Sequence, residues 1–342
     1  MKKFIYTILV CALPTIGNAQ DYHSSNLQNI SQLYNPALVA LKNDMAANVS
    51  YRTQWRSVGS PFNAIGASFE STVEPTHRKN EAHFALGFNA YREQLSRQGS
   101  MASFSVNAAQ HIRVTKYSSL SLGIGFGIFG TSFNEENGAW ESQHNGLFYD
   151  ENLPSGEVFE SNQKTTFDIG TGMVYAIQSR DHDIKLFQVG LSAYHLNQPI
   201  ISYTGTAVSR LPIRKVFFSS FAIPFEIGKR ESYVEGSILY QNQRKFNSFM
   251  IGAMVKTQLT EKAKTTSSVS KINSIYVGLG MYLRGKDALI FNAQIQKTKW
   301  TASLAYDATI STLKNNSRGA VEFQLSYVIP KYSNRNLYKH LD

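Results

Sequence analysis

The chain has 342 residues with 34 Lys or Arg and 24 Asp or Glu, which gives a formal net charge of +10. This length allows one large domain or two small ones. The only cysteine, Cys11, lies in the apolar N-terminal stretch, so the processed chain is predicted to contain neither disulfides nor cysteine metal ligands. Beyond that stretch, no apolar run reaches the roughly eighteen residues that a membrane-spanning helix needs.

Residues 1–19 have the pattern of a secretory signal peptide. Two lysines, an apolar core over 4–13 and small residues at 17–19 precede a predicted cut ahead of Gln20. Cys11 follows Val10 inside the apolar core, so we do not expect a lipidated cysteine. Removal of both lysines leaves 10 − 2 = +8. An exported protein rarely meets nucleic acid, so we attribute this charge to solvated turns, lumen walls and attraction to outer-membrane lipid headgroups.

Residues 20–45 form a polar segment that is not expected to be a strand. Pro36 disfavours the helical region for Asn35. We predict that this N-terminal segment is periplasmic or plugs the following domain.

From residue 46 to 330 the sequence alternates apolar with small or polar residues, which is the pattern of strands with one apolar and one polar face. A soluble antiparallel sandwich alternates in the same way. Here the polar face carries Gly, Ser, Gln and charge, which favours a water-lined barrel interior. We therefore predict an all-β fold, a transmembrane antiparallel β-barrel of about 14 strands, followed by a tail over 331–342. The expected strands cover 47–55, 62–70, 84–91, 101–114, 120–129, 165–178, 185–195, 215–227, 232–241, 248–258 and four more within 271–329.

One long connection, 131–164, interrupts the strands and is acidic. Its carboxylates include Glu135, Glu136, Asp150 and Glu151, with no Lys or Arg before Lys164. If the first strand rises from the periplasm, this connection, 196–214 and 307–317 face outside, where loops run long. The polar connection 259–271 is longer than inner turns usually are. Acidic loops can bind Ca²⁺, but the D-x-D-x-D-G spacing is missing, so we assign no metal site.

No catalytic or cofactor motif is expected to function in this chain. Gly125, Gly127 and Gly130 match G-x-G-x-x-G, but the alternation continues through them, whereas a dinucleotide site needs a strand to end there. A lipase or protease would need a Ser–His or Asp–His pair at a barrel rim, and no spacing indicates one. Asp168, Asp307 and Arg52 fall on predicted lumen faces, either as a network or as solvated residues. We predict that the protein is not an enzyme and binds no cofactor.

Three stretches keep their order and spacing along the chain. Leu33–Leu38 contains Asn35-Pro36-Ala37, Tyr51–Trp55 contains R-x-Q-W with Pro61 following, and Ser303–Tyr327 covers the last pair of expected strands. Together they resemble the N-P-A segment, the R-x-Q-W motif and the closing pair of strands of the PorP/SprF family of type IX secretion proteins of Bacteroidetes. Where the family commonly has two glycines before the last strand, this chain has Arg318-Gly319.

The resemblance implies an outer-membrane barrel that works beside the type IX secretion machinery. Members are associated with exporting or anchoring large surface adhesins that carry a C-terminal targeting domain, including adhesins for gliding motility. The motif positions Asn35, Pro36, Arg52, Gln54 and Trp55 are candidate partner-binding residues, or they brace the barrel. The acidic loop is the expected place for specificity. The alternative function is a porin-like diffusion channel, which an open lumen would favour and a lumen filled by residues 20–42 would oppose.

Overall fold

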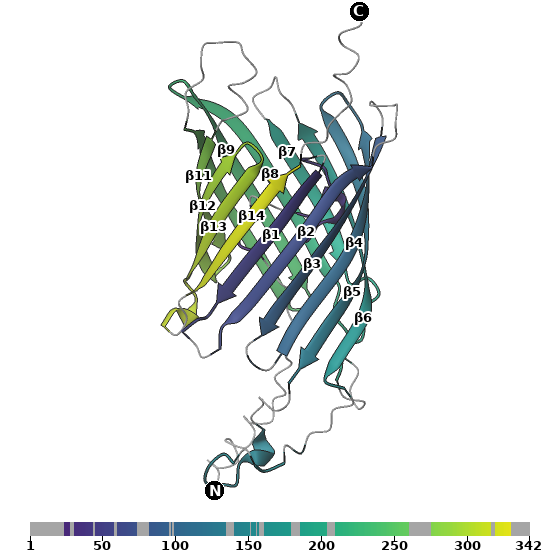
Figure 1. The fold of residues 1–342 in the computed structure, drawn as a ribbon, viewed down its shortest axis with the longest axis vertical. Coiled ribbons are helices and arrows are strands. Elements are labelled where there is room, and N and C mark those ends of the chain that lie inside the picture. Colours follow the sequence, from purple (N-terminus) through teal and green to yellow (C-terminus); the bar gives the residue numbers. More distant parts are fainter. Residues whose placement is uncertain are drawn as a thin grey trace, which may run out of the picture.

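The computed structural model describes residues 24–27, 31–43, 45–57, 60–73, 82–95, 97, 99–134, 140–150, 152–154, 156, 161–178, 185–203, 209–259, 275–315 and 319–329. Within these residues the strands form one closed barrel in which each strand pairs with its sequence neighbours and β1 pairs with β14 (Figure 1). All pairings are antiparallel. The predicted 14-stranded antiparallel β-barrel is confirmed.

Each predicted strand is present, and most extend a few residues beyond the predicted ends. The strands are β1 (Met45–Gln54), β2 (Phe62–Val73), β3 (Ala82–Leu95), β4 (Gly99–Arg113), β5 (Ser118–Phe133), β6 (Gln163–Gln178), β7 (Leu186–Tyr194), β8 (Arg214–Ile227), β9 (Arg230–Gln243), β10 (Phe246–Gln258), β11 (Ile275–Arg284), β12 (Ala288–Lys297), β13 (Trp300–Thr309) and β14 (Ala320–Val328). Short 3-10 turns lie at Pro36–Leu38, Glu141–Gln143 and Thr312–Asn315.

The outward face of the barrel is apolar. On β5, Leu122, Ile124, Phe126 and Ile128 are exposed, while the glycines between them face inward. This is the face that a lipid bilayer covers. Among the described residues no helix is long and apolar enough to cross a membrane.

The interior differs from the water-lined lumen that the sequence predicted. Val174, Phe218, Leu239 and Ile290 face inward from β6 to β12 and are almost fully buried. They belong to an apolar core that also contains Leu27, Tyr34, Ala37 and Leu38 from the N-terminal segment. On the opposite half of the wall, Asn48, Ser68, Asn89 and Ser105 lie side by side in register and form a neutral polar patch. The larger apolar core therefore lies on the β6–β12 side, and a smaller one, made by Val39, Ala40, Ala85 and Ala109, lies against β3 and β4.

The two ends of the barrel differ. At the end where β1 begins, which we call the turn end, three described connections are short: 114–117, 228–229 and 298–299. The opposite end, the loop end, carries the connections 134–162 and 195–213. In the second of these, Leu211 is buried against Met101 and Phe129, so this connection folds over the interior. The predicted signal peptide, the predicted tail 331–342 and the loop residues Glu135, Glu136 and Glu151 lie outside the described residues.

Candidate functional site

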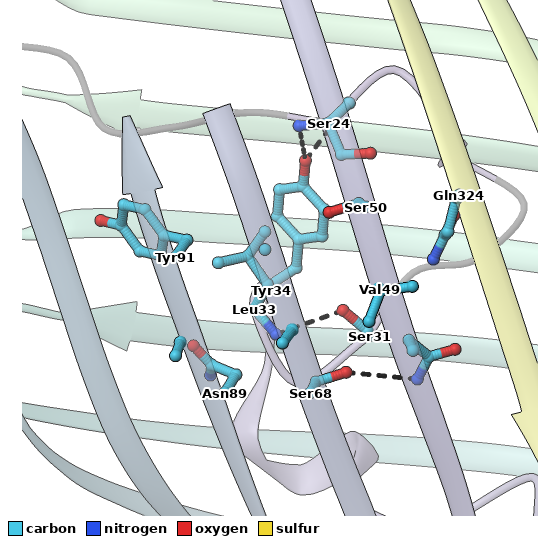
Figure 2. Close-up of a pocket in the computed structure, with 14 residues that line it drawn as sticks. Ser24, Ser31, Leu33, Tyr34, Val49, Ser50, Ser68, Asn89, Tyr91 and Gln324 are labelled. Atoms are coloured by element: carbon cyan, nitrogen blue, oxygen red, sulfur yellow. Dashed lines mark hydrogen bonds between the residues drawn. The ribbon is translucent and has the colours of Figure 1, made fainter. Parts of the chain in front are cut away.

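The described residues 24–27 and 31–43, which we call the interior segment, lie inside the barrel and bond to its wall at several levels. Figure 2 shows Ser31, Leu33 and Tyr34 of this segment against the strands β1, β2 and β3. The Tyr34 hydroxyl accepts a hydrogen bond from the Ser24 amide at 2.7 Å, which ties the two parts of the segment together. The N-terminal segment is not a strand in the described residues, as predicted.

The motif Asn35-Pro36-Ala37 forms the tightest part of the segment. The side-chain oxygen of Asn35 accepts from the Ala37 amide at 2.9 Å and caps the 3-10 turn, and Pro36 suits the first position because its φ is already fixed. The Asn35 side-chain NH₂ donates to the carbonyls of Met173 at 3.1 Å and Leu191 at 3.0 Å. These two residues are opposite each other on β6 and β7. One amide group therefore fixes the turn to two strands.

Glycines on the wall make this close approach possible. A Cβ atom added at Gly123 would lie 2.3 Å from the Ala37 nitrogen, and one at Gly172 would lie 2.1 Å from the Asn35 side-chain oxygen. The inward-facing Gly123 on β5 and Gly172 on β6 thus form a cradle for the turn. The sequence prediction that the G-x-G-x-x-G match is accidental agrees with a strand that runs through all three glycines.

A second amide repeats the contact of Asn35. Gln32 donates from its Nε2 to the carbonyls of Phe69 at 3.0 Å and Phe88 at 2.9 Å, which are opposite each other on β2 and β3. The Asn107 side chain donates to the Gln32 Oε1 at 3.0 Å. On the other side of the barrel, the Tyr194 hydroxyl donates to the Gln32 carbonyl at 2.8 Å. The segment is therefore bonded to both sides of the interior.

Near the loop end, a buried ion network surrounds residues 24–27. Asp307 accepts from Arg52 and Arg284, each at 2.9 Å, and Glu322 lies 3.3 Å from Arg52. The positive charges of these two arginines equal in number the negative charges of the two buried carboxylates. Ser25 joins them: its amide donates to Glu322 at 2.8 Å and its hydroxyl to Asp307 at 2.8 Å. Breaking such a buried pair from one side typically costs about 3–5 kcal/mol.

A pocket remains between the interior segment and the neutral polar patch of the wall around Asn48, Ser68 and Asn89 (Figure 2). Hydroxyl and amide side chains dominate its lining and no charged residue is present, so it suits water or uncharged polar groups. It is lined by Ser24, Ser31, Leu33, Tyr34, Asn48, Val49, Ser50, Gly66, Ala67, Ser68, Asn89, Ala90, Tyr91 and Gln324.

The predicted site residues divide into two groups. Asn35, Pro36 and Arg52 are buried inside the barrel. Gln54 and Trp55 lie at the loop end, where the Trp55 ring packs on Phe62 with centroids 4.9 Å apart and its amide donates to the Gly319 carbonyl. The two groups meet at one point, because the Arg52 guanidinium donates to the Gln54 side-chain oxygen at 3.2 Å.

Of the acidic loop residues singled out in the sequence, Asp150 is described and is half-buried. Its carboxylate accepts from the Asn152 amide at 3.0 Å. Within the described ranges no group of three or more His, Cys, Asp or Glu is placed to hold a metal ion.

Sequence reasoning missed several residues of the site. Arg52 and Asp307 were expected on lumen faces, and the structure brings them together, but their partners Arg284 and Glu322 were not singled out. In the sequence, these partners are marked only as charged residues at the inward-facing positions of an alternating strand. Gln32 lies in a polar segment with no motif to mark it.

The sequence also gave no sign of an Asp–His pair, yet the structure contains one. The Nδ1 of His195 lies 2.9 Å from the carboxylate of Asp168. The pair bridges β6 to the residue after β7, where the Leu196 amide also donates to the Ile169 carbonyl at 3.0 Å. The imidazole packs edge-on against Phe129. These contacts close the wall beyond the end of β7, which is a structural role.

The profile of one family, described as "Type IX secretion system membrane protein PorP/SprF", matches residues 16–327. No curated protein matches the chain. A crystal structure of the toluene transporter TbuX of Ralstonia pickettii is 10% identical with a TM-score of 0.46, and the match covers 86% of this chain and 92% of that one.

Two further structures are similar. The TodX deltaS2S3 mutant, a monoaromatic hydrocarbon channel, is 11% identical over 90% of this chain and 94% of that one, with a TM-score of 0.42. BamA of Haemophilus ducreyi lacking POTRA domains 1-3 is 11% identical over 84% of this chain and 70% of that one, with a TM-score of 0.39. These likenesses concern the barrel fold and carry nothing about activity.

Proposed function

Because the chain belongs to the PorP/SprF family of type IX secretion system membrane proteins, we propose that it is a closed docking barrel. In this role it exports or anchors a large adhesin-type surface protein at the outer membrane and does not pass small solutes. The observation that carries the proposal is the interior segment, which is bonded to the wall from β1 to β14. The family and the fold are those of secretion and transport proteins, not of enzymes.

The interior segment argues against the porin-like alternative. Its Asn35 and Gln32 amides bond to strands on different sides of the barrel, and its apolar residues fill the half lined by Phe218 and Leu239. Leu211 adds a second obstruction near the loop end. A diffusion channel would need a continuous path for water and ions, and these contacts oppose one.

The partner is expected at the loop end, which the length rule for barrel connections makes the cell-surface end. The acidic connection 134–162 joins β5 to β6 at this end, and the rim residues Gln54 and Trp55 lie at the same end on β1 and directly after it. We propose that Asp150, with Glu135, Glu136 and Glu151, supplies specificity for a basic surface of the partner. The type IX machinery and the C-terminal targeting domain of the surface protein are the expected binding partners.

The buried motif positions are assigned a different role in this proposal. Asn35, Pro36 and Arg52 have their side chains engaged inside the barrel, so we propose that they brace the interior segment. Their effect on a partner is then indirect, through the shape of the loop end.

The first experiment is recovery of the tagged protein from outer membranes, followed by mass spectrometry of its companions. We expect one large surface protein to be recovered with the wild type. Replacement of residues 135–160 by a short Gly-Ser linker should abolish its recovery. The same replacement of residues 261–273, a connection at the turn end, is the matched control and should leave recovery unchanged. Equal recovery with both variants would contradict specificity in the acidic loop.

The second experiment is conductance in planar bilayers. The wild-type barrel is expected to be silent, whereas a variant lacking residues 24–43 should conduct because the interior loses its filling. Steady conductance of the wild type, together with recovery of no partner, would overturn the docking proposal and favour a porin-like channel.

A further inference from the structure

An outward aromatic row crosses β8, β9 and β10 towards the loop end. Phe217 is opposite Tyr240, and Tyr240 is opposite Phe249, so the three rings lie side by side on the lipid-facing surface. Tyr240 and Phe249 are exposed. Rows of this kind mark the boundary between the hydrocarbon and the headgroups of a membrane.

A polar row lies one step closer to the loop end, about 7 Å along the strands at the usual rise per residue. Lys215 is opposite Asn242, which is opposite Asn247. The Tyr240 hydroxyl and the Asn242 side-chain NH₂ both donate to the Asn247 side-chain oxygen, at 2.9 Å and 2.8 Å. These hydrogen bonds therefore hold the polar side chains next to the aromatic row, on its loop-end side.

Three cations gather at this level. Lys215 is exposed on the outward face of β8, and Arg244 and Lys245 form the two-residue turn between β9 and β10. Within the described ranges none of the three forms an ion pair with a carboxylate. Because this turn is so short, it holds its charges at the depth of the headgroups, whereas a long loop would carry them into the aqueous phase.

We propose that Lys215, Arg244 and Lys245 bind the phosphate groups of lipid A in the outer leaflet of the outer membrane. The loop end faces that leaflet by the connection-length rule, and lipid A is the phosphorylated lipid found there. The cations neutralise the phosphates while the aromatic row packs against acyl chains, and Asn242 and Asn247 flank the headgroup. This inference depends on membrane placement and is independent of the secretion role.

The test uses the full-length barrel in detergent, titrated with diphosphorylated lipid A and followed by native mass spectrometry. The variant Lys215→Gln/Arg244→Gln/Lys245→Gln is compared with Lys229→Gln/Arg230→Gln/Lys297→Gln, which removes three exposed cations from the turn end. We expect the first variant to bind about 100-fold more weakly, because each basic side chain near an anionic surface strengthens binding by about fivefold and three are removed. The control should bind as the wild type does.

The source of the phosphate is tested with two further ligands. Phosphatase-treated lipid A and phosphatidylglycerol should both bind the wild type more weakly than diphosphorylated lipid A. Equal binding of dephosphorylated lipid A, equal binding of phosphatidylglycerol, or an unchanged affinity in the first triple variant would overturn the proposal. Heat-modifiable electrophoretic mobility checks that each barrel is folded, and the single variant Arg244→Gln replaces the triple variant if that one fails to fold.

Discussion

Substitution of Gly123 by Ala should loosen the interior segment without opening the barrel. The added Cβ would lie 2.3 Å from the Ala37 nitrogen and 2.5 Å from the Pro36 carbonyl carbon. Both are backbone atoms of a capped turn, so no side-chain rotation relieves the overlap. Overpacking of this kind typically costs about 1–3 kcal/mol. The wall itself should survive, because the strand pairings on either side of β5 do not involve this Cβ position.

Cysteine labelling measures the effect, because Cys11 in the predicted signal peptide is the single cysteine of the sequence. With Leu38→Cys, a buried position of the segment, the rate of reaction with a maleimide reports how often the segment leaves the wall. A loss of about 1–3 kcal/mol corresponds to an increase of about 5-fold to 150-fold in that rate when opening is a rapid pre-equilibrium.

The matched control is Gly130→Ala on the same strand, whose nearest non-neighbour atom would be 3.7 Å from the new Cβ, an ordinary contact. It shares the change in strand propensity but not the overlap. Equal labelling rates in the Gly123→Ala and Gly130→Ala backgrounds would refute the argument that the glycine cradle holds the segment.

Substitutions at two other positions, Asp307 and Asn35, test the remaining anchors. Asp307→Asn should destabilise the barrel by about 3 kcal/mol, because it leaves Arg52 and Arg284 buried without this carboxylate. The control Asp287→Asn changes a side chain that is 57% exposed and should cost less than about 1 kcal/mol. The temperature at which the compact electrophoretic form is lost measures both variants, and equal shifts would contradict the network. Asn35→Ala should raise the rate of Leu38→Cys labelling, because it removes the cap of the turn and two hydrogen-bond donors. Asn35→Asp should raise this rate further, because a carboxylate then faces two carbonyl oxygens. An unchanged labelling rate in both variants would contradict the role of Asn35 as an anchor.

The barrel was predictable because its signal is local. Each strand needs only an alternation of period two, which β5 shows over its inward glycines and outward apolar residues. The apolar half of the interior was not predictable in the same way. On β8, Val216, Phe217 and Phe218 are consecutive, so both faces are apolar and alternation cannot tell the packed interior from the lipid face.

The site was only partly predictable for a different reason. The N-P-A motif marked Asn35, but its partners Met173 and Leu191 are separated from it by 138 and 156 residues. They are recognised through their backbone carbonyls, which leave no trace in residue type. Arg52 and Asp307 were expected on the interior face, yet their pairing depends on the register across β1, β14 and β13.

The distribution of contacts indicates that the interior segment is a permanent filling and not an easily displaced gate. The ion pairs of Arg52, Arg284, Asp307 and Glu322 are made within the wall, and Ser25 adds hydrogen bonds to charges that are already paired. Departure of the segment would therefore leave the network intact. It would, however, expose the apolar half of the interior to water, at about 25 cal/mol for each Å² of apolar surface. That cost opposes displacement of the whole interior segment. A conformational change confined to the loop end would therefore release residues 24–27, while the turn at Asn35 stayed in its cradle.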